Sequence, residues 1–207
     1  MVKMVIYDCD GVIFDSKKAN QEYYNYILKN FGFPPVDSND EEKLEIIHTY
    51  SNDEVLKKIF PNETLAQKAI EFSQSVDYSQ FYKYMTIEPE FFDTCKELKK
   101  RGIKLAIATN RSRTFPHLFS YFNLEKIIDD YVTVSIIKNP KPAPDMLIYL
   151  LKKNKLNPEE AIFIGDSIID YQASKYAKIP FIGYKIKFEN SLKINKHSEI
   201  LKYLQNR

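Results

Sequence analysis

The sequence predicts an α/β fold: a Rossmann-like parallel sheet core with helices on both faces, plus an inserted α-helical cap domain. Two observations support this prediction. Residues 1–14 and about 88–207 alternate short apolar runs with longer helical patterns, which is typical of a parallel sheet. The segment from about 16 to 84 contains helical patterns and no convincing strand. We therefore expect a core domain formed by residues 1–15 and 86–207, and a helical cap formed by residues 16–85.

The expected strands of the core are short and mostly apolar. They are Met4–Tyr7, Lys104–Ala108, Tyr131–Ser135, Ala161–Ile164 and Phe181–Gly183. Helical patterns lie between them, such as Glu90–Arg101, which Gly102 closes, and Ala143–Asn154, which Pro144 opens. Because ligands of such sheets bind beyond the carboxyl ends of the strands, a functional site is expected at that edge.

The insert is divided into helices by capping and helix-breaking residues. Asn39 is the expected cap of the second helix, and Ser51 and Glu54 form a capping-box pattern at the start of the third. The expected helices are 16–30, 40–48, 51–60 and 63–76.

Composition argues against several classes of function. The chain has 207 residues with 30 Lys and Arg against 28 Asp and Glu, so its net charge is +2. A nucleic-acid binder would usually be far more basic, and we expect no nucleic-acid partner. No apolar stretch approaches the roughly 20 residues that span a bilayer, and no signal-like segment precedes the first strand, so we expect no membrane partner. With two cysteines, a disulfide framework is not expected, and the simplest expectation is a cytoplasmic protein. The sequence does not indicate the oligomeric state.

The first expected strand runs directly into the segment YDCDGV, residues 7–12. Side chains alternate along a strand, so Asp8 and Asp10 are expected to point the same way, while Cys9 faces the core. Two like charges about 4 Å apart repel by roughly 4 kcal/mol at an effective dielectric near 20. Such a pair requires a cation between the carboxylates or a proton on one of them. Gly11 and nearby backbone amides can form a nest that binds an anion.

Polar residues also follow three other expected strands: Thr109-Asn110, Lys138 and Lys141, and Asp166 with Asp170. In a parallel sheet these ends converge, so carboxylates, a hydroxyl, an amide and an ammonium should surround one crevice. Carboxylates together with substrate phosphate commonly hold Mg²⁺, and a carboxylate can be a covalent nucleophile for a phosphoryl group. A second carboxyl group can exchange protons with the leaving oxygen and with water. The set predicts phosphoryl-transfer chemistry.

The order D-x-D-G-V at residues 8–12, then Thr109-Asn110, Lys141-Pro142 and G-D-S-x-x-D at residues 165–170 resembles the haloacid dehalogenase superfamily. It looks most like the capped phosphatases, which include phosphoglycolate phosphatases, β-phosphoglucomutases and pyrophosphatases. The resemblance implies a Mg²⁺-dependent phosphatase that hydrolyses a small soluble phosphate monoester through an aspartyl-phosphate intermediate. Its partner would be a small phosphorylated metabolite of the phosphoglycolate type.

The resemblance also implies a role for each motif residue. Asp8 would be the nucleophile and Asp10 the general acid/base, with a backbone carbonyl that faces the metal. Thr109 and Lys141 would hold the transferring phosphoryl group. The implied metal ligands are Asp8, Asp10, Asp166 and Asp170, the last as a ligand or beside one. An acid at position 10 indicates a phosphatase or mutase, since dehalogenases of the family lack it.

Substrate contacts are expected from Gly11, Asn110 and Arg111 of the core, and from His48 and Tyr50 between two cap helices, where relatives place a specificity loop. Plainer interpretations stand beside these. Arg111 is also interpretable as a solvated arginine, and Tyr50 as a residue packed into an interhelix turn.

Helix capping is the plainer interpretation for Thr109, Asn110 and Asp166, and first-turn charge for Asp170. The alternative functions are a β-phosphoglucomutase-like phosphomutase, a pyrophosphatase or, more distantly, a non-catalytic phospho-binding or signalling domain.

Overall fold

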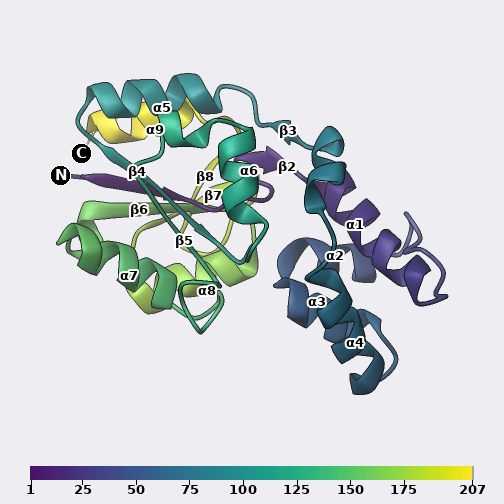
Figure 1. The fold of residues 1–207 in the computed structure, drawn as a ribbon. Helices are drawn as coiled ribbons and strands as arrows, with labels where there is room; N and C mark the ends of the chain where they lie inside the picture. The colour runs from purple at the N-terminus through teal and green to yellow at the C-terminus, as the bar shows by residue number, and fades with distance from the viewer. Residues whose placement is uncertain (207) are drawn as a thin grey trace.

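A computed structural model of the chain describes residues 1–206 and shows an α/β core joined to a helical domain (Figure 1). The core sheet has six strands in the order β5-β4-β1-β6-β7-β8, and every neighbouring pair is parallel. The strands are β1 (Met4–Tyr7), β4 (Lys104–Thr109), β5 (Asp130–Thr133), β6 (Ala161–Gly165), β7 (Phe181–Tyr184) and β8 (Leu192–Ile194). The predicted parallel sheet with a helical insert is confirmed, while β8 was not predicted.

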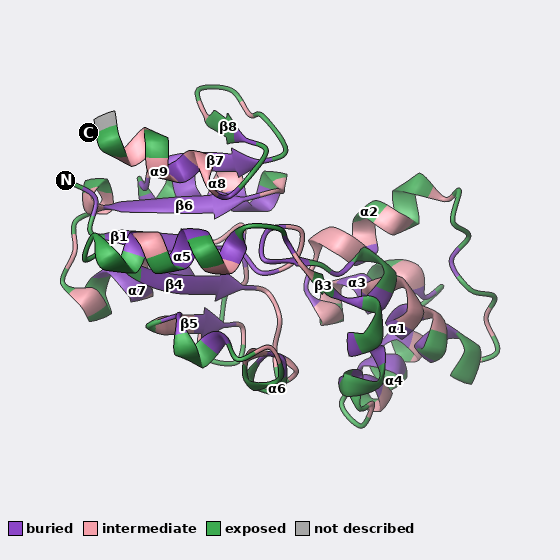
Figure 2. Cartoon of the chain, turned by 90° about the horizontal axis from the view of Figure 1, so that it is seen from above, coloured by how far each residue is buried: buried purple, intermediate pink, exposed green. Residues whose placement is uncertain are grey.

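Helices cover both faces of this sheet. Figure 1 shows α5 (Phe91–Lys100) and α9 (Glu199–Tyr203) on one face, and α7 (Asp145–Asn154) and α8 (Ile168–Ala177) on the other. The central strand β1 is buried along its whole length, as Figure 2 shows, because it lies between β4 and β6 and under both helical layers. Such burial explains why its sequence is a continuous apolar run. The short helix α6 (Phe115–Tyr121) follows β4 and was not predicted.

The insert, residues 17–84, follows β2 and contains helices joined by loops, with no strand. It contains α1 (Lys17–Asn30), α2 (Glu41–Thr49), α3 (Asn52–Ile59), α4 (Glu63–Ser73) and the 3₁₀ helix η1 (Tyr78–Tyr84). The capping box of Ser51 and Glu54 is present at the start of α3. The predicted cap of α2 was wrong by one residue: the Asp40 carboxylate, not Asn39, accepts the backbone N–H of Lys43 at 3.1 Å.

Where the chain leaves and re-enters the core, the two connecting segments pair with each other. β2 (Phe14–Asp15) and β3 (Thr86–Ile87) form a short antiparallel ribbon, and Glu88 donates its N–H to the Ile13 carbonyl at 2.8 Å. The sequence predicted only linkers here. The domain bounds at residues 15/16 and 85/86 stay a prediction.

The remaining elements are the 3₁₀ turns η2 (Leu124–Lys126), η3 (Pro158–Glu160) and η4 (Leu204–Asn206). Across residues 1–206, no helix has the length and apolar character needed to cross a membrane.

Candidate active site

The carboxyl ends of the strands form one wall of a cavity of about 680 Å³ between the core and the helical insert. Asp8 directly follows β1, Thr109 ends β4, and Asp166 directly follows β6. Lys141 reaches the same cavity from the loop before α7. The predicted convergence of polar strand ends on one crevice is therefore present.

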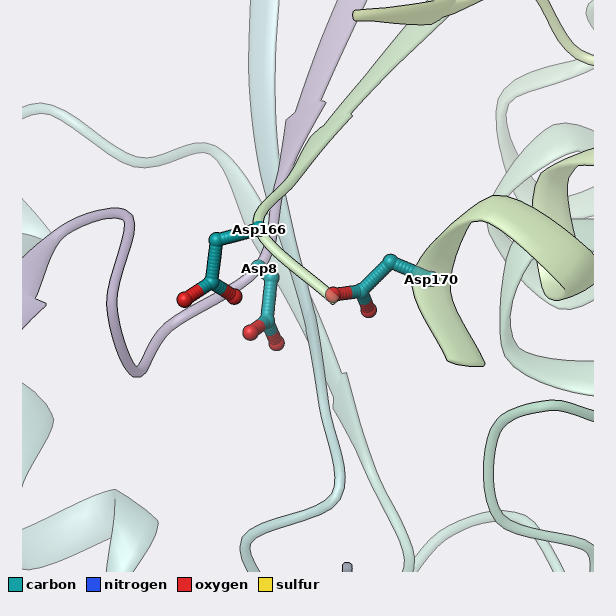
Figure 3. Close-up of side chains that lie close together, drawn as sticks. All are labelled: Asp8, Asp166 and Asp170. Carbon is teal, nitrogen blue, oxygen red and sulfur yellow. The ribbon is translucent and has the colours of Figure 1, made fainter. Parts of the chain in front are cut away.

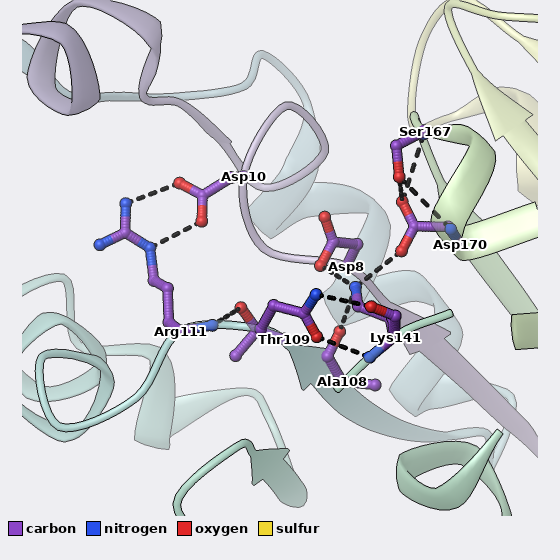
Figure 4. Close-up of polar contacts among 9 residues, drawn as sticks. Asp8, Asp10, Ala108, Thr109, Arg111, Lys141, Ser167 and Asp170 are labelled. Carbon is purple, nitrogen blue, oxygen red and sulfur yellow. Dashed lines mark hydrogen bonds and ion pairs between the residues drawn. The ribbon is translucent and has the colours of Figure 1, made fainter. Parts of the chain in front are cut away.

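Lys141 bonds to two carboxylates at the centre of the site. Its Nζ donates to Asp8 Oδ1 at 2.5 Å, to Asp170 Oδ1 at 2.6 Å and to the Ala108 carbonyl at 2.9 Å (Figure 4). The residue is 3% exposed. Burial alone would lower the pKa of Lys141, but the negative charges of Asp170 and Asp8 raise it, so the ammonium stays charged.

Three carboxylates gather beside this ammonium. Asp8, Asp166 and Asp170 each place an oxygen within 4.8 Å of the others, and Figure 3 shows Asp170 approaching from α8. Burial raises the pKa of Asp8, Lys141 lowers it, and the charges of Asp170 and Asp10 raise it, with a net pKa of about 7. Burial, then the charges of Asp170 and Asp8, raise the pKa of Asp166 well above its ordinary value.

Such crowding favours either bound protons or a divalent cation that offsets the repulsion. Hard carboxylate oxygens at this spacing are the donors that Mg²⁺ prefers, so the residues fit the predicted cofactor. The Asp10 side chain does not belong to this group of three.

Two glycines make room for the carboxylates. At Gly11, whose φ is +76°, an added Cβ would lie 1.8 Å from Asp166 Oδ2. At Gly165, an added Cβ would lie 2.4 Å from the Asp170 Cβ. The expected anion-binding role of Gly11 is corrected, because its N–H already donates to the Phe14 carbonyl at 2.7 Å. Gly11 instead lets Asp166 approach.

Asp170 is held from two sides. Its Oδ2 accepts from the Ser167 hydroxyl at 2.5 Å and from the Ser167 N–H at 3.2 Å, while Oδ1 accepts from Lys141. Ser167, and not Asp166, is the N-cap of α8. Asp166 thus has no capping role, and Asp170 combines first-turn charge with a place in the carboxylate group.

Asp10 bonds to a different basic residue than Asp8 does. Its Oδ2 accepts from Arg111 Nε at 2.7 Å, and its Oδ1 accepts from Arg111 Nη2 at 2.6 Å (Figure 4). Oδ1 also accepts from the Ser16 hydroxyl. Asp8 and Asp10 border the same cavity, as expected, although β1 ends at Tyr7, before both of them, and their carboxylates bond to different basic residues. Burial alone would raise the pKa of Asp10, but Arg111 and the Ser16 hydroxyl outweigh burial and lower it.

Arg111 is not a solvated arginine. Its side chain is only 8% exposed, and its Nη2 also donates to Tyr78 Oη at 3.2 Å and to Asn20 Oδ1 at 3.3 Å. The guanidinium carbon lies 4.8 Å from the centre of the Tyr78 ring. Asn20 and Tyr78 belong to the insert and Ser16 to the linker before it. Sequence reasoning missed their place beside the site, because no local pattern marks such contacts.

Thr109 and Asn110 do not cap a helix, since α6 begins only at Phe115. Thr109 Oγ1 accepts from the Arg111 N–H at 3.1 Å, and its hydroxyl borders the cavity. The Asn110 amide accepts from the Lys141 N–H at 2.9 Å and donates to the Lys141 carbonyl at 3.1 Å. Asn110 thus positions Lys141, and it also borders the cavity, so its expected substrate contact stays a prediction.

His48 and Tyr50 both border the cavity from the insert. His48 lies in the last turn of α2, its Nδ1 is buried with no partner among residues 1–206, and burial lowers its pKa to about 4. Tyr50 is half-buried against the core of the insert, with Lys58 Nζ 4.6 Å from its ring centre. Their contact with substrate stays a prediction.

The fold and the site together define an α/β enzyme. Its site contains buried carboxylates bonded to one lysine, and the helical insert borders the same cavity. The chain belongs to the haloacid dehalogenase-like hydrolase family, whose model matches residues 5–184. The predicted family and the prediction of a phosphatase-type enzyme are thereby confirmed, and a non-catalytic domain is not supported.

Known proteins are similar to this chain over most of its length. A phosphoglycolate phosphatase from Psychrobacter arcticus is 26% identical over 87% of this chain and 82% of its own length. A pyrophosphatase PpaX from Oceanobacillus iheyensis is 21% identical over 93% of this chain and 88% of its own. The crystal structure of a subfamily IA haloacid dehalogenase-superfamily hydrolase from Geobacter sulfurreducens is 35% identical, with a TM-score of 0.79 over 98% of this chain and 96% of that one.

Proposed function

We propose that this enzyme is a Mg²⁺-dependent phosphatase that hydrolyses a small soluble phosphate monoester, of the phosphoglycolate phosphatase type, through an aspartyl-phosphate on Asp8. The observation that carries the proposal is the position of Asp8. It is buried, it borders the cavity, one of its oxygens bonds to Lys141, and it lies beside Asp166 and Asp170. A relative named phosphoglycolate phosphatase supports the substrate class.

The proposed reaction has two steps. In the first, Asp8 Oδ2, which Lys141 does not bind, forms a bond to phosphorus while the ester P–O bond breaks, and Asp10, once it has left Arg111 and taken up a proton, gives that proton to the leaving oxygen. In the second, water attacks the same phosphorus, Asp10 takes its proton, and the Asp8–phosphate bond breaks to release inorganic phosphate. Both Lys141 and Thr109 border the cavity: the Lys141 ammonium supplies positive charge beside the phosphoryl oxygens, and the Thr109 hydroxyl offers them a donor.

Asp8, Asp166 and Asp170 would hold the metal ion. A bound Mg²⁺ supplies the positive charge that lets a phosphate dianion approach three carboxylates. In the structure, both oxygens of Asp10 are bonded to Arg111. To act as the general acid/base, Asp10 must therefore leave Arg111 and turn toward the leaving oxygen.

The proposal is tested by hydrolysis of an aryl phosphate by the purified chain in excess chelator, and again after Mg²⁺ is restored. We expect no turnover in the chelator and full recovery with Mg²⁺. Asp166→Asn, which keeps the shape and removes the charge, should raise the Mg²⁺ concentration needed for half-maximal turnover. A protein that turns over fully without a divalent cation would overturn the metal assignment.

A further inference from the structure

Arg111 joins the acid/base candidate to the insert at one point of the cavity wall. Its guanidinium grips both oxygens of Asp10 and also bonds Asn20 of α1 and Tyr78 of η1. Arg111, Asp10 and Asp8 all border the same cavity. The pair formed by Arg111 and Asp10 is therefore next to the place where a substrate must lie.

Both carboxylate oxygens of Asp10 are hydrogen-bonded. Oδ1 accepts from Ser16 and Arg111, and Oδ2 accepts from Arg111. To exchange a proton with a leaving oxygen, Asp10 must break its hydrogen bonds to Arg111 and rotate away from it. The guanidinium would then stay behind, buried and without its counter-charge, which is a strongly unfavourable state.

A second anion would remove this penalty. The guanidinium is planar and its fork matches a carboxylate or a phosphate. Asp10 occupies the edge formed by Nε and Nη2, while Nη1 donates no hydrogen bond within residues 1–206. An anionic group that arrives in the cavity can thus approach Nη1 first and then take over the fork.

We infer that Arg111 binds a second anionic group carried by the leaving group of the substrate, and that this group replaces Asp10 on the guanidinium. The inference deepens the proposed function and rests on it. It assigns the substrate class: phosphate monoesters whose leaving group bears its own carboxylate or phosphate, a short distance from the ester. A neutral leaving group leaves Asp10 bound to Arg111 and is processed slowly.

The test compares substrates that differ in one charge. The probes are 2-phosphoglycolate, its neutral amide 2-phosphoglycolamide, and ethanediol bisphosphate, with p-nitrophenyl phosphate as the measure of phosphatase activity itself. We expect kcat/KM for phosphoglycolate or for the bisphosphate to exceed that for the amide by about 10²-fold, the scale of an unpaired buried charge. Which of the two anions is favoured identifies the second group as carboxylate or phosphate.

Arg111→Gln removes the charge and keeps hydrogen-bonding capacity. It should reduce the preference for charged over neutral leaving groups to within about 3-fold, since no buried guanidinium remains to be neutralised. Arg113→Gln is the matched control: Arg113 borders the same cavity and, among residues 1–206, its guanidinium hydrogen-bonds to Gln74 alone, at 3.4 Å, so its removal should leave the preference intact. Thermal unfolding establishes that each variant is folded.

The inference is overturned if the wild-type protein cleaves the amide as well as the charged esters. It is also overturned if Arg111→Gln lowers kcat/KM for charged and neutral esters by the same factor. The wild-type comparison decides the matter even if Arg111→Gln does not fold. Failure of the proposed function looks different: no cleavage of p-nitrophenyl phosphate or of any other ester with Mg²⁺ present.

Discussion

A Gly11→Ala substitution should have two separable effects: backbone strain, which lowers stability, and displacement of Asp166, which lowers activity. The Gly11 φ of +76° costs an L-residue roughly 1–2 kcal/mol. An alanine Cβ there would also lie 1.8 Å from Asp166 Oδ2, so the carboxylate must retreat by about 1.2 Å to reach even 3.0 Å. Displacements of this size at a reacting centre cost about 10²-fold in rate.

The matched control is Gly102, which ends the turn after α5. Its φ is +74°, and an added Cβ would meet nothing within 4 Å. Gly102→Ala should therefore lose about the same free energy of unfolding, roughly 1–2 kcal/mol, and keep its activity. Gly11→Ala should lose that stability and, in addition, about 10²-fold in kcat/KM together with about 10-fold or more in Mg²⁺ affinity.

Urea unfolding and Mg²⁺ titrations of turnover on an aryl phosphate measure the two effects separately. If both alanine variants retain equal turnover and equal Mg²⁺ dependence, then Gly11 does not serve to admit Asp166, and the reasoning from its geometry is refuted.

Three further predictions concern the groups around Asp8. Asp10→Asn should lower kcat by about 10²–10⁴ on alkyl phosphates and much less on aryl phosphates, whose leaving oxygens need little protonation; equal losses on both would remove Asp10 from the acid role. Asn110→Ala should lower kcat more than it raises KM, and cost about 1–3 kcal/mol of unfolding free energy, because the Lys141 backbone loses both partners; an unchanged kcat would contradict this positioning role. Mg²⁺ affinity, measured by calorimetric titration, should fall as pH drops through about 7, because Asp8 must lose its proton to act as a ligand; a flat profile would contradict the raised pKa. Without metal, the folded chain keeps the Asp8 proton that the unfolded chain has released between pH 3.8 and about 7, so unfolding free energy should fall as pH rises through that window, by roughly 1.4 kcal/mol per unit between the two pKa values.

The parts of the fold that follow from local patterns were predictable. β1 is a continuous apolar run because a central parallel strand is buried on both faces, and its bounds were predicted correctly. The capping box at Ser51 needs only residues three apart, and it too was predicted correctly. The strand β8, with two of its three residues exposed, carries no apolar run from which to predict it.

The contacts of the site were less predictable, because they join residues far apart in the sequence. The sequence indicated which residues gather, but not that Asp10 bonds to Arg111, 101 positions away. Ser16 is the N-cap residue of α1, yet its hydroxyl donates to Asp10 and makes no capping bond, which the sequence alone does not indicate. Gly11 was expected to form an anion nest with nearby backbone amides, and only the fold brings Asp166 against it.

The most direct test of the account is the location of the phosphoryl group during turnover. Rapid acid quench of the Mg²⁺-loaded enzyme with substrate, followed by peptide mass analysis, should find the phosphoryl group on Asp8. Asp8→Asn should abolish both the adduct and turnover while the protein stays folded. A phosphoryl group on another residue, or turnover that survives in Asp8→Asn, would contradict the central claim that Asp8 is the nucleophile.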